Sequence, residues 1–249
     1  MKNKFLLFAF IVLMVVSCKK DDPKPSYSLS KNELTLFKDG TNQLEITGAT
    51  TEVFTYTSKN DLIASVDEKG MITGERVGET SINVSCNGYI DSCIVSIMPK
   101  YRTFEEPITS FGISKSEVKA KETRKLYTEG EDIIIYEGSI LEEYVSYFFD
   151  DGKLTVSAVI LDSKYSSVLG GYLAERYLMA SVSPIFGYSV DNKFMVGATL
   201  EDVQNSLSWW VAYVPHDSNK STSIKSQTDM LFNKYRIEKV LNEQINPLH

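Results

Sequence analysis

Three pairs of neighbouring acidic residues are the side chains best suited to chemistry in this sequence: Glu142–Glu143, Asp150–Asp151 and Glu201–Asp202. Two carboxyl groups can hydrolyse a glycosidic bond when they face each other about 5–10 Å apart. Neighbouring residues on a strand point to opposite faces, so these pairs are not expected to supply facing groups. We therefore expect turns and solvated surfaces at the acidic pairs, and we predict no catalytic residue.

Histidine is scarce, since the chain contains only His216 and His249. Zinc hydrolases and Ser-His-Asp enzymes use histidine as a metal ligand or as a base. No GxSxG, HExxH, P-loop or GxGxxG motif occurs. The sequence therefore favours a binding protein without metal or cofactor over an enzyme. A glycan hydrolase or accessory enzyme that uses carboxylates alone is the alternative.

Two cysteines, Cys86 and Cys93, are separated by six residues. In an exported protein this spacing favours a local disulfide over a metal site. The pairing depends on the turn between them. A turn centred on Tyr89 and Ile90 places the two cysteines opposite each other, whereas a two-residue Asn87–Gly88 turn pairs Cys86 with Tyr89. We predict the disulfide on the condition that the wider turn forms.

Residues 207–214, Leu-Ser-Trp-Trp-Val-Ala-Tyr-Val, are expected to form a strand that carries the binding site. Alternation places Trp209 and Tyr213 on one face and Trp210 on the other. Only one face can pack helices, so the other would present an aromatic ring for stacking on a sugar or insertion into a protein partner. The alternative, that a tail helix or a loop covers this face, stays open.

The N-terminus determines where such a site would work. An apolar block over residues 5–16 follows two lysines and precedes Ser17 and Cys18. The block is shorter than a bilayer span but has the length of the apolar part of a signal peptide. Its end resembles the lipobox of bacterial lipoproteins, which implies removal of residues 1–17 and acylation of Cys18, including a palmitate. An ordinary secretion signal with an incidental cysteine is the alternative.

The residues after Cys18, Lys-Lys-Asp-Asp, resemble the export tag of Bacteroidetes surface lipoproteins. This resemblance implies a lipid-anchored position on the outer membrane, exposed to the outside. We expect residues 18–26 to form an extended linker because they contain two prolines. The formal net charge of −7 argues against a nucleic-acid partner, and 43% hydrophobic residues suffice for two packed domains.

Residues 27–98 show short alternating strands with turn signals every eight to twelve residues, which is typical of an antiparallel sandwich. The stretch from Tyr56 to Val84, with glycines at 70, 74 and 78, resembles the bacterial immunoglobulin-like (Ig-like) domain of group 2. The resemblance implies an all-β sandwich that serves as a spacer or adhesin stalk. Tyr56 stands where the family usually has a buried tryptophan.

Residues 99–107 are expected to be a linker between prolines, and residues 108–249 an α+β domain. Ser114 and Glu117 form a capping box that predicts a helix to about Leu126. Strand patterns follow at 132–136, 143–149 and 154–161. A helical pattern at 169–177 precedes three further strand patterns, near 181–190, 193–200 and 207–214.

This repeated unit of one helix and three strands, opened by Phe111-Gly112-Ile-Ser-Lys-Ser-Glu-Val118, resembles the tandem beta-lactamase-inhibitor-like fold of envelope lipoproteins. The resemblance implies contact with proteins through an open sheet face. A last amphipathic pattern runs from Met230 to Gln244, with Ile237, Val240 and Leu241 on its apolar stripe. We expect it to pack on the second domain rather than to recruit a partner helix. The sequence thus predicts a surface lipoprotein that binds an extracellular protein or glycan.

Overall fold

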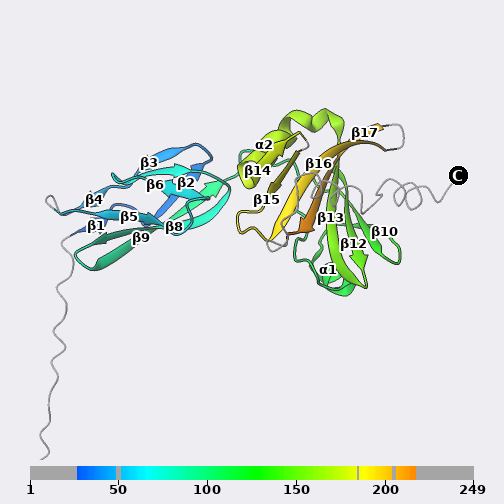
Figure 1. Cartoon of the computed structure of the whole chain (residues 1–249), viewed down its shortest axis with the longest axis horizontal. Helices are drawn as coiled ribbons and strands as arrows, with labels where there is room; N and C mark the ends of the chain where they lie inside the picture. Colours follow the sequence, from blue (N-terminus) through cyan, green and yellow to red (C-terminus); the bar gives the residue numbers. More distant parts are fainter. Residues whose placement is uncertain (1–26, 49–51, 184, 204–205, 217–249) are drawn as a thin grey trace, which may run out of the picture.

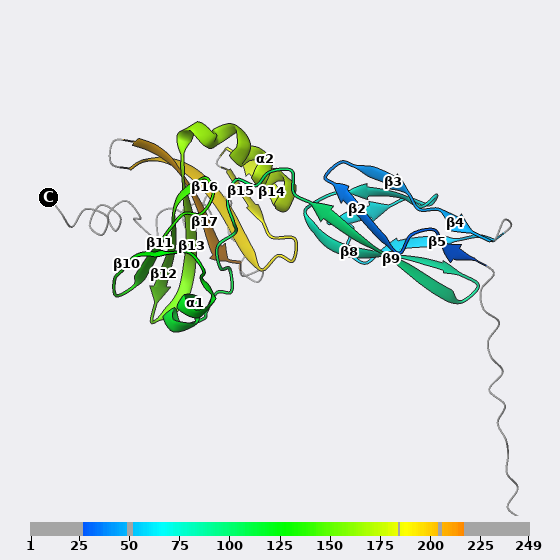
Figure 2. The same cartoon turned by 180° about the vertical axis from the view of Figure 1, so that it is seen from behind.

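The computed structural model describes residues 27–48, 52–183, 185–203 and 206–216 (Figure 1). The predictions for residues 1–17, Cys18, the linker over 18–26 and the tail helix over 230–244 lie outside these residues. The described residues form two units that lie end to end, an N-terminal unit (27–98) and a C-terminal unit (101–216) (Figures 1 and 2). Among the described residues, no helix combines the length and apolar character needed to cross a bilayer.

The N-terminal unit consists of strands alone. They are β1 (Ser28–Leu29), β2 (Glu33–Phe37), β3 (Thr41–Gln43), β4 (Ile46–Thr47), β5 (Thr55–Ser58), β6 (Ala64–Val66), β7 (Met71–Gly74), β8 (Gly78–Cys86) and β9 (Tyr89–Met98). They form one sheet in the order β2-β9-β8-β5, a second in the order β3-β7-β6, and the pair β1-β4. The all-β sandwich predicted for this part of the chain is confirmed.

Alternation along β8 builds the core of this unit. Ile82 and Val84 point inward with no exposed surface, and Val95 of β9 joins them. Tyr56 is half-buried at the edge of this core. Gly70 has a φ of 82°, and a Cβ there would come within 2.7 Å of the Tyr56 ring. Glycine is therefore required at position 70 both by its backbone conformation and by the tyrosine next to it.

The predicted disulfide between Cys86 and Cys93 is wrong. Asn87 and Gly88 form the turn, with φ values of 50° and 86°, and Cys86 pairs with Tyr89. Cys93 pairs with Ile82, four residues from Cys86 along β8, which corresponds to about 13 Å at the rise of a strand. A disulfide requires Cα atoms within about 7 Å. Both thiols are accordingly buried and free.

The C-terminal unit contains two α-helices and one large sheet. Its elements are α1 (Lys115–Lys121), β10 (Leu126–Glu129), β11 (Ile133–Glu137), β12 (Glu142–Asp150), β13 (Lys153–Asp162), η1 (Ser163–Tyr165), α2 (Ser166–Arg176), β14 (Leu178–Val182), β15 (Ile185–Tyr188), β16 (Phe194–Val203) and β17 (Ser206–Pro215). The sheet order is β10-β11-β12-β13-β17-β16-β15-β14, and every neighbouring pair is antiparallel.

The predicted α+β class is confirmed for this unit, but the predicted tandem units of one helix and three strands are wrong. The strands form a single eight-stranded sheet, in which β13 pairs with β17. The capping box of Ser114 and Glu117 starts α1 as expected, yet the helix ends at Lys121 rather than near Leu126. Glu122 is extended, with ψ at 130°, its carboxylate accepts from the N–H group of Arg124, and the chain continues into the additional strand β10.

Side chains on both faces of this sheet are buried. One cluster lies under the helices and includes Val118 of α1 together with Leu169 and Leu173 of α2. The second cluster lies on the opposite face and consists only of strand residues. The segment expected to be a linker, residues 99–107, contributes to the helix-side cluster. Phe104 is 3% exposed and packs on Tyr172 at 4.1 Å between ring centroids, so the segment is anchored in the C-terminal unit.

Candidate functional site

The three aromatic residues predicted to bind a partner occupy three different environments. The register of β17 places Trp209 and Tyr213 on the helix side and Trp210 on the other face, as the alternation predicted. Tyr213 has no exposed surface, and its hydroxyl accepts a hydrogen bond from Tyr177 (3.3 Å). Trp210 is 1% exposed. The expectation that one face leaves an aromatic residue open is therefore wrong for both of these side chains.

Trp209 is the one residue of the three that keeps solvent access. It is half-buried, and its indole Nε1 donates to Ser166 Oγ at the start of α2 (2.7 Å). Leu200 lies directly opposite on β16 and is 42% exposed, and Leu207 lies two residues before it and is 52% exposed. These three residues share one face of the hairpin. We call them the Trp209 patch.

The sequence reasoning missed both leucines of this patch. The two strands are ten residues long and pair without a register shift, from Phe194 opposite Pro215 to Val203 opposite Ser206. A hairpin register assigned from the alternation of both strands would have placed Leu200 beside Trp209. Exposed apolar side chains that adjoin one another are characteristic of contact surfaces.

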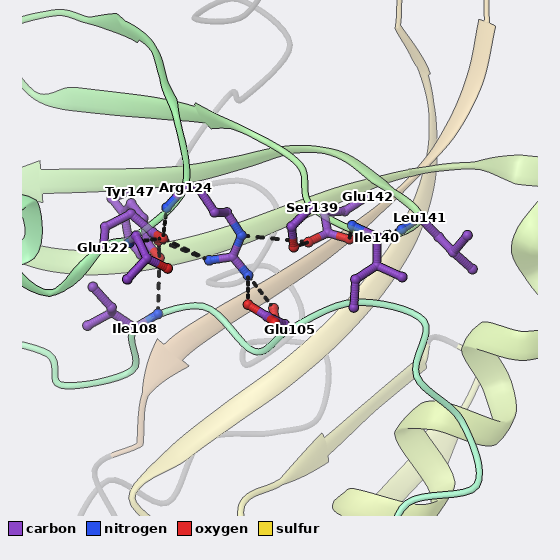
Figure 3. A network of polar contacts seen from close by, with 10 residues as sticks. Glu105, Ile108, Glu122, Arg124, Ser139, Ile140, Leu141, Glu142 and Tyr147 are labelled. Carbon is purple, nitrogen blue, oxygen red and sulfur yellow. Dashed lines mark hydrogen bonds and ion pairs between the residues drawn. The ribbon is translucent and has the colours of Figure 1, made fainter.

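A second candidate is a buried polar cluster around Arg124, which connects α1, β12 and the segment before α1 (Figure 3). The Arg124 side chain is 6% exposed and lies between Glu122 and Glu142, whose side chains are 2% and 0% exposed. Its Nη1 contacts Glu122 Oε2 at 3.0 Å, and its Nε lies 3.6 Å from Glu142 Oε1. Its Nη2 donates to the carbonyl oxygen of Glu105 (2.8 Å).

Each buried carboxylate also has partners other than the arginine. Glu142 accepts from Ser139 Oγ (2.8 Å) and from the N–H groups of Ile140 and Leu141 (3.0 Å each). Glu122 accepts from the hydroxyl of Tyr147 and from two backbone N–H groups, those of residues 123 and 124. The cluster thus satisfies two buried negative charges, as buried ionised groups require.

The electrostatics of this cluster differ from those of a glycosidase. Burial by itself raises the pKa of Glu122, but the hydrogen bond from Tyr147, the backbone N–H groups and the charge of Arg124 together hold that pKa below its ordinary value. Burial and the bond to Glu122 raise the pKa of Tyr147. A general acid needs a raised carboxyl pKa and access to substrate. Glu122 and Glu142 instead face a guanidinium group, which makes the cluster structural.

The acidic pairs, which were expected at turns and solvated surfaces, lie in different environments. Glu143 is exposed, as expected of a solvated acid, whereas Glu142 is buried and bound within the Arg124 cluster. Asp150 and Asp151 belong to the hairpin between β12 and β13, where Asp151 has a φ of 49°. In the part of the chain that the structure describes, no three His, Cys, Asp or Glu side chains are placed to hold a metal ion.

Comparison with known proteins concerns the N-terminal unit. The family model of the bacterial Ig-like domain (group 2) matches residues 24–87. This part of the chain is therefore similar to a group 2 bacterial Ig-like domain, and we call the N-terminal unit the Ig-like domain. The match contains the glycines at 70, 74 and 78 from which the resemblance was inferred, as well as strands β1 to β8. The comparison with curated proteins found no significant match.

Three solved structures are similar to the chain at a low level. An intimin mutant from EHEC O157:H7 is 18% identical over 40% of this chain and 51% of its own, with a TM-score of 0.23. Domains 5–6 of the S-layer protein SbsC are 11% identical over 79% of this chain and 86% of their own, with a TM-score of 0.26. Domains 4–9 of SbsC are 13% identical over 79% of this chain and 27% of their own, with a TM-score of 0.26. The chain spans about half of the intimin chain.

The Ig-like domain is joined to the C-terminal unit by hydrogen bonds at the end of α2. Glu175, 2% exposed, accepts from the N–H groups of Lys100 (3.0 Å) and Tyr101 (3.1 Å) through its carboxylate. Its backbone carbonyl accepts from Val77 N–H of the Ig-like domain (2.8 Å). Arg76 Nε also donates to the carbonyl of residue 177 (3.4 Å). These bonds lie at and beside the segment that was expected to be a linker.

Gly171 of α2 belongs to the same junction. A Cβ at this position would lie 2.4 Å from the ring of Tyr101, so the glycine gives the tyrosine room against the helix. At Gly170, in contrast, a Cβ would meet open space. One of these two neighbouring glycines therefore brings the helix close to the segment between the two units.

We expect Glu175→Ala to loosen this junction. The substitution leaves the part-buried N–H groups of Lys100 and Tyr101 without their acceptor and removes the ion-pair partner of Arg176. Each unpaired group costs up to about 1–3 kcal/mol, the value for a fully buried one. Small-angle scattering of the protein should then show a wider range of distances between the two units, and the unfolding midpoint of the C-terminal unit should fall. Glu68→Ala, an exposed turn residue of the Ig-like domain, serves as the control. Unchanged scattering in the Glu175 variant would contradict a role in fixing the two units.

Proposed function

We propose that this protein is a surface lipoprotein whose C-terminal unit binds an extracellular protein or glycan through the Trp209 patch. The Ig-like domain acts as a spacer between that unit and the membrane. The observation that carries the proposal is the patch itself, a tryptophan held at its indole nitrogen and flanked by Leu200 and Leu207, which are 42% and 52% exposed.

The geometry of the patch suits recognition. The bond from Trp209 Nε1 to Ser166 fixes the ring, so less conformational entropy is lost when a partner binds. A tryptophan beside exposed aliphatic side chains supplies a large apolar area and an aromatic face, which serve equally for a sugar ring and for a protein side chain. The patch lies in the C-terminal unit, and the Ig-like domain precedes that unit along the chain.

We expect Trp209→Ala to abolish most of the binding while the fold is kept. Truncating an exposed aromatic anchor costs about 2 kcal/mol of binding free energy, a loss of about thirtyfold in affinity. The purified wild-type protein would be applied to a glycan array and to intact bacterial cells. The variant would then be titrated against the glycan or the cells that the wild type binds. Ile140→Ala, another exposed apolar residue of the C-terminal unit, should bind like the wild type. Equal binding by the Trp209 variant would overturn the proposal.

The proposed anchor has its own test. We expect a Cys18→Ala precursor to keep its N-terminal segment and to leave the detergent phase, because the thiol that receives the diacylglyceryl group is lost. Several acyl chains at about 0.8 kcal/mol per buried CH₂ hold a protein on a membrane durably, so the wild type should withstand a carbonate wash. Membrane retention of the variant after that wash would show that another part of the chain provides the attachment.

A further inference from the structure

The face of the eight-stranded sheet that lies opposite α1 and α2 is apolar and buried. We call it the strand face. Its core residues are each 0–4% exposed, and all of them belong to strands β11, β12, β13, β15, β16 and β17: Ile133, Ile135, Phe148, Val156, Ala158, Ile160, Phe186, Met195, Trp210, Ala212 and Val214. The buried apolar residues of α1 and α2 belong to the cluster on the other face. The described helices therefore do not cover the strand face.

Burial to this extent requires a layer above the sheet. Side chains on one face stand side by side, so neighbouring strands cover their flanks but leave their outer ends open. A closed barrel would cover them, but among the described strands β10 and β14 are the two edges of an open order and do not pair with each other. An additional element therefore has to lie on the strand face.

Two polar atoms on this face point to the same requirement. Trp210 Nε1 and Ser146 Oγ are buried and have no hydrogen-bond partner among the described residues. Ser146 lies opposite Ala158 and Ile135, both members of the strand face. An indole N–H can only donate. The covering layer must therefore be apolar in the middle and able to bring an acceptor near Trp210.

We propose that residues 226–244 of the same chain form this layer, as an amphipathic helix that packs its apolar stripe on the strand face. The described part of the chain ends at His216, directly after β17, which lies in the interior of the sheet order between β13 and β16. The ten residues that follow could extend over about 30 Å, enough to bring the segment back across the sheet.

The length and pattern of the segment fit this position. A helix from Met230 to Gln244 is about 22 Å long, which corresponds to four or five strands at a spacing of about 4.8 Å. Its stripe of Ile237, Val240 and Leu241 matches an apolar face, and Glu238 and Lys239 fall outside the stripe. The segment also offers an acceptor on the side of the stripe, Gln244, for the indole N–H of Trp210.

This inference does not depend on the proposed function. It gives the neighbouring tryptophans separate roles, since Trp210 lies under the tail helix while Trp209, on the other face, stays accessible. It also leaves the Trp209 patch as the candidate contact surface of the hairpin. A chain that lost the tail would expose a second apolar surface, on which unspecific association is expected.

Fluorescence of Trp210 tests the inference in the full chain. Trp209→Phe leaves Trp210 as the only tryptophan, because the chain contains two. In this background Leu241→Asp should raise acrylamide quenching severalfold and shift the emission to longer wavelength, since a charge on the stripe weakens docking. Asn242→Asp carries the same charge change on the polar side and should behave like the parent. Equal quenching in both variants would overturn the proposal.

A cleavage experiment covers the case in which Leu241→Asp prevents folding. A protease site inserted after Ser218 is cut in the folded protein, and the products are separated by gel filtration. The tail fragment should co-elute with the body and separate from it only in denaturant. If it separates while Trp210 stays protected, the tail is not the covering layer. A protein that is dimeric by light scattering before and after cleavage, with Trp210 still protected, would assign the face to a second copy and overturn the proposal.

Discussion

Replacing Arg124 by methionine is expected to destabilise the C-terminal unit by about 3–5 kcal/mol, the usual cost of removing one partner of a buried ion pair. Arg124 lies between Glu122 and Glu142, both almost fully buried. Without it the two carboxylates keep their hydrogen bonds but lose the only guanidinium group that they contact among the described residues. Urea denaturation of the chain, followed by circular dichroism, measures the loss.

Neutral replacements of the two glutamates distinguish this charge effect from a packing defect. Adding Glu122→Gln and Glu142→Gln to Arg124→Met removes both unpaired charges, so the triple variant should recover part of the lost stability. Arg102→Met, at an exposed position, should change the free energy of unfolding by less than about 0.5 kcal/mol. A loss below about 1 kcal/mol for Arg124→Met would show that the cluster is dispensable for the fold.

The second large effect is expected for Trp210→Ala, with a loss of about 3–5 kcal/mol in unfolding free energy. Trp210 is 1% exposed in the centre of the strand face, next to Ile160 and Ala212. Truncation removes most of an indole ring from a packed cluster and leaves a cavity that β-sheet neighbours cannot fill. Thermal and urea unfolding should both report the loss.

Trp209→Ala is the matched comparison, since it removes the same side chain one residue away on the other face. Its side chain is only partly buried, so less apolar area is lost from the core, and the loss of stability should stay well below that of Trp210→Ala. Equal losses for the two variants would indicate that Trp209 is a core residue and would remove the basis of the contact surface. The unfolding free energy of Trp210→Phe should lie between those of the wild type and Trp210→Ala.

Much of the local structure could be predicted from the sequence. The alternation of residues 207–214 placed Trp209 and Tyr213 opposite Trp210, as found. The capping box located the start of α1 at Ser114. The strand rhythm and the glycines of residues 27–98 indicated the sandwich, and the family match at residues 24–87 agrees. Each of these features depends on residues a few positions apart, whose spacing alone determines the turn, the cap or the face.

The candidate site was predicted only in part. One of its three residues, Trp209, was named, whereas Leu200 became part of it through the register of β16 and β17. The acid Glu142, expected in solvent, became buried because Arg124, 18 residues before it in the sequence, reaches it from the end of α1. A sequence pattern does not reveal which distant partner a charged residue will meet.

The sequence by itself therefore determined the strands, the caps, the Ig-like domain and the faces on which side chains lie. Only the tertiary structure decided which of these faces are covered. The two-residue turn at Asn87–Gly88 separated Cys86 from Cys93, and the pairing of β13 with β17 merged two sets of strands into one sheet. Burial follows from contacts between elements far apart in the chain, and the periodicity of a single element carries no information about them.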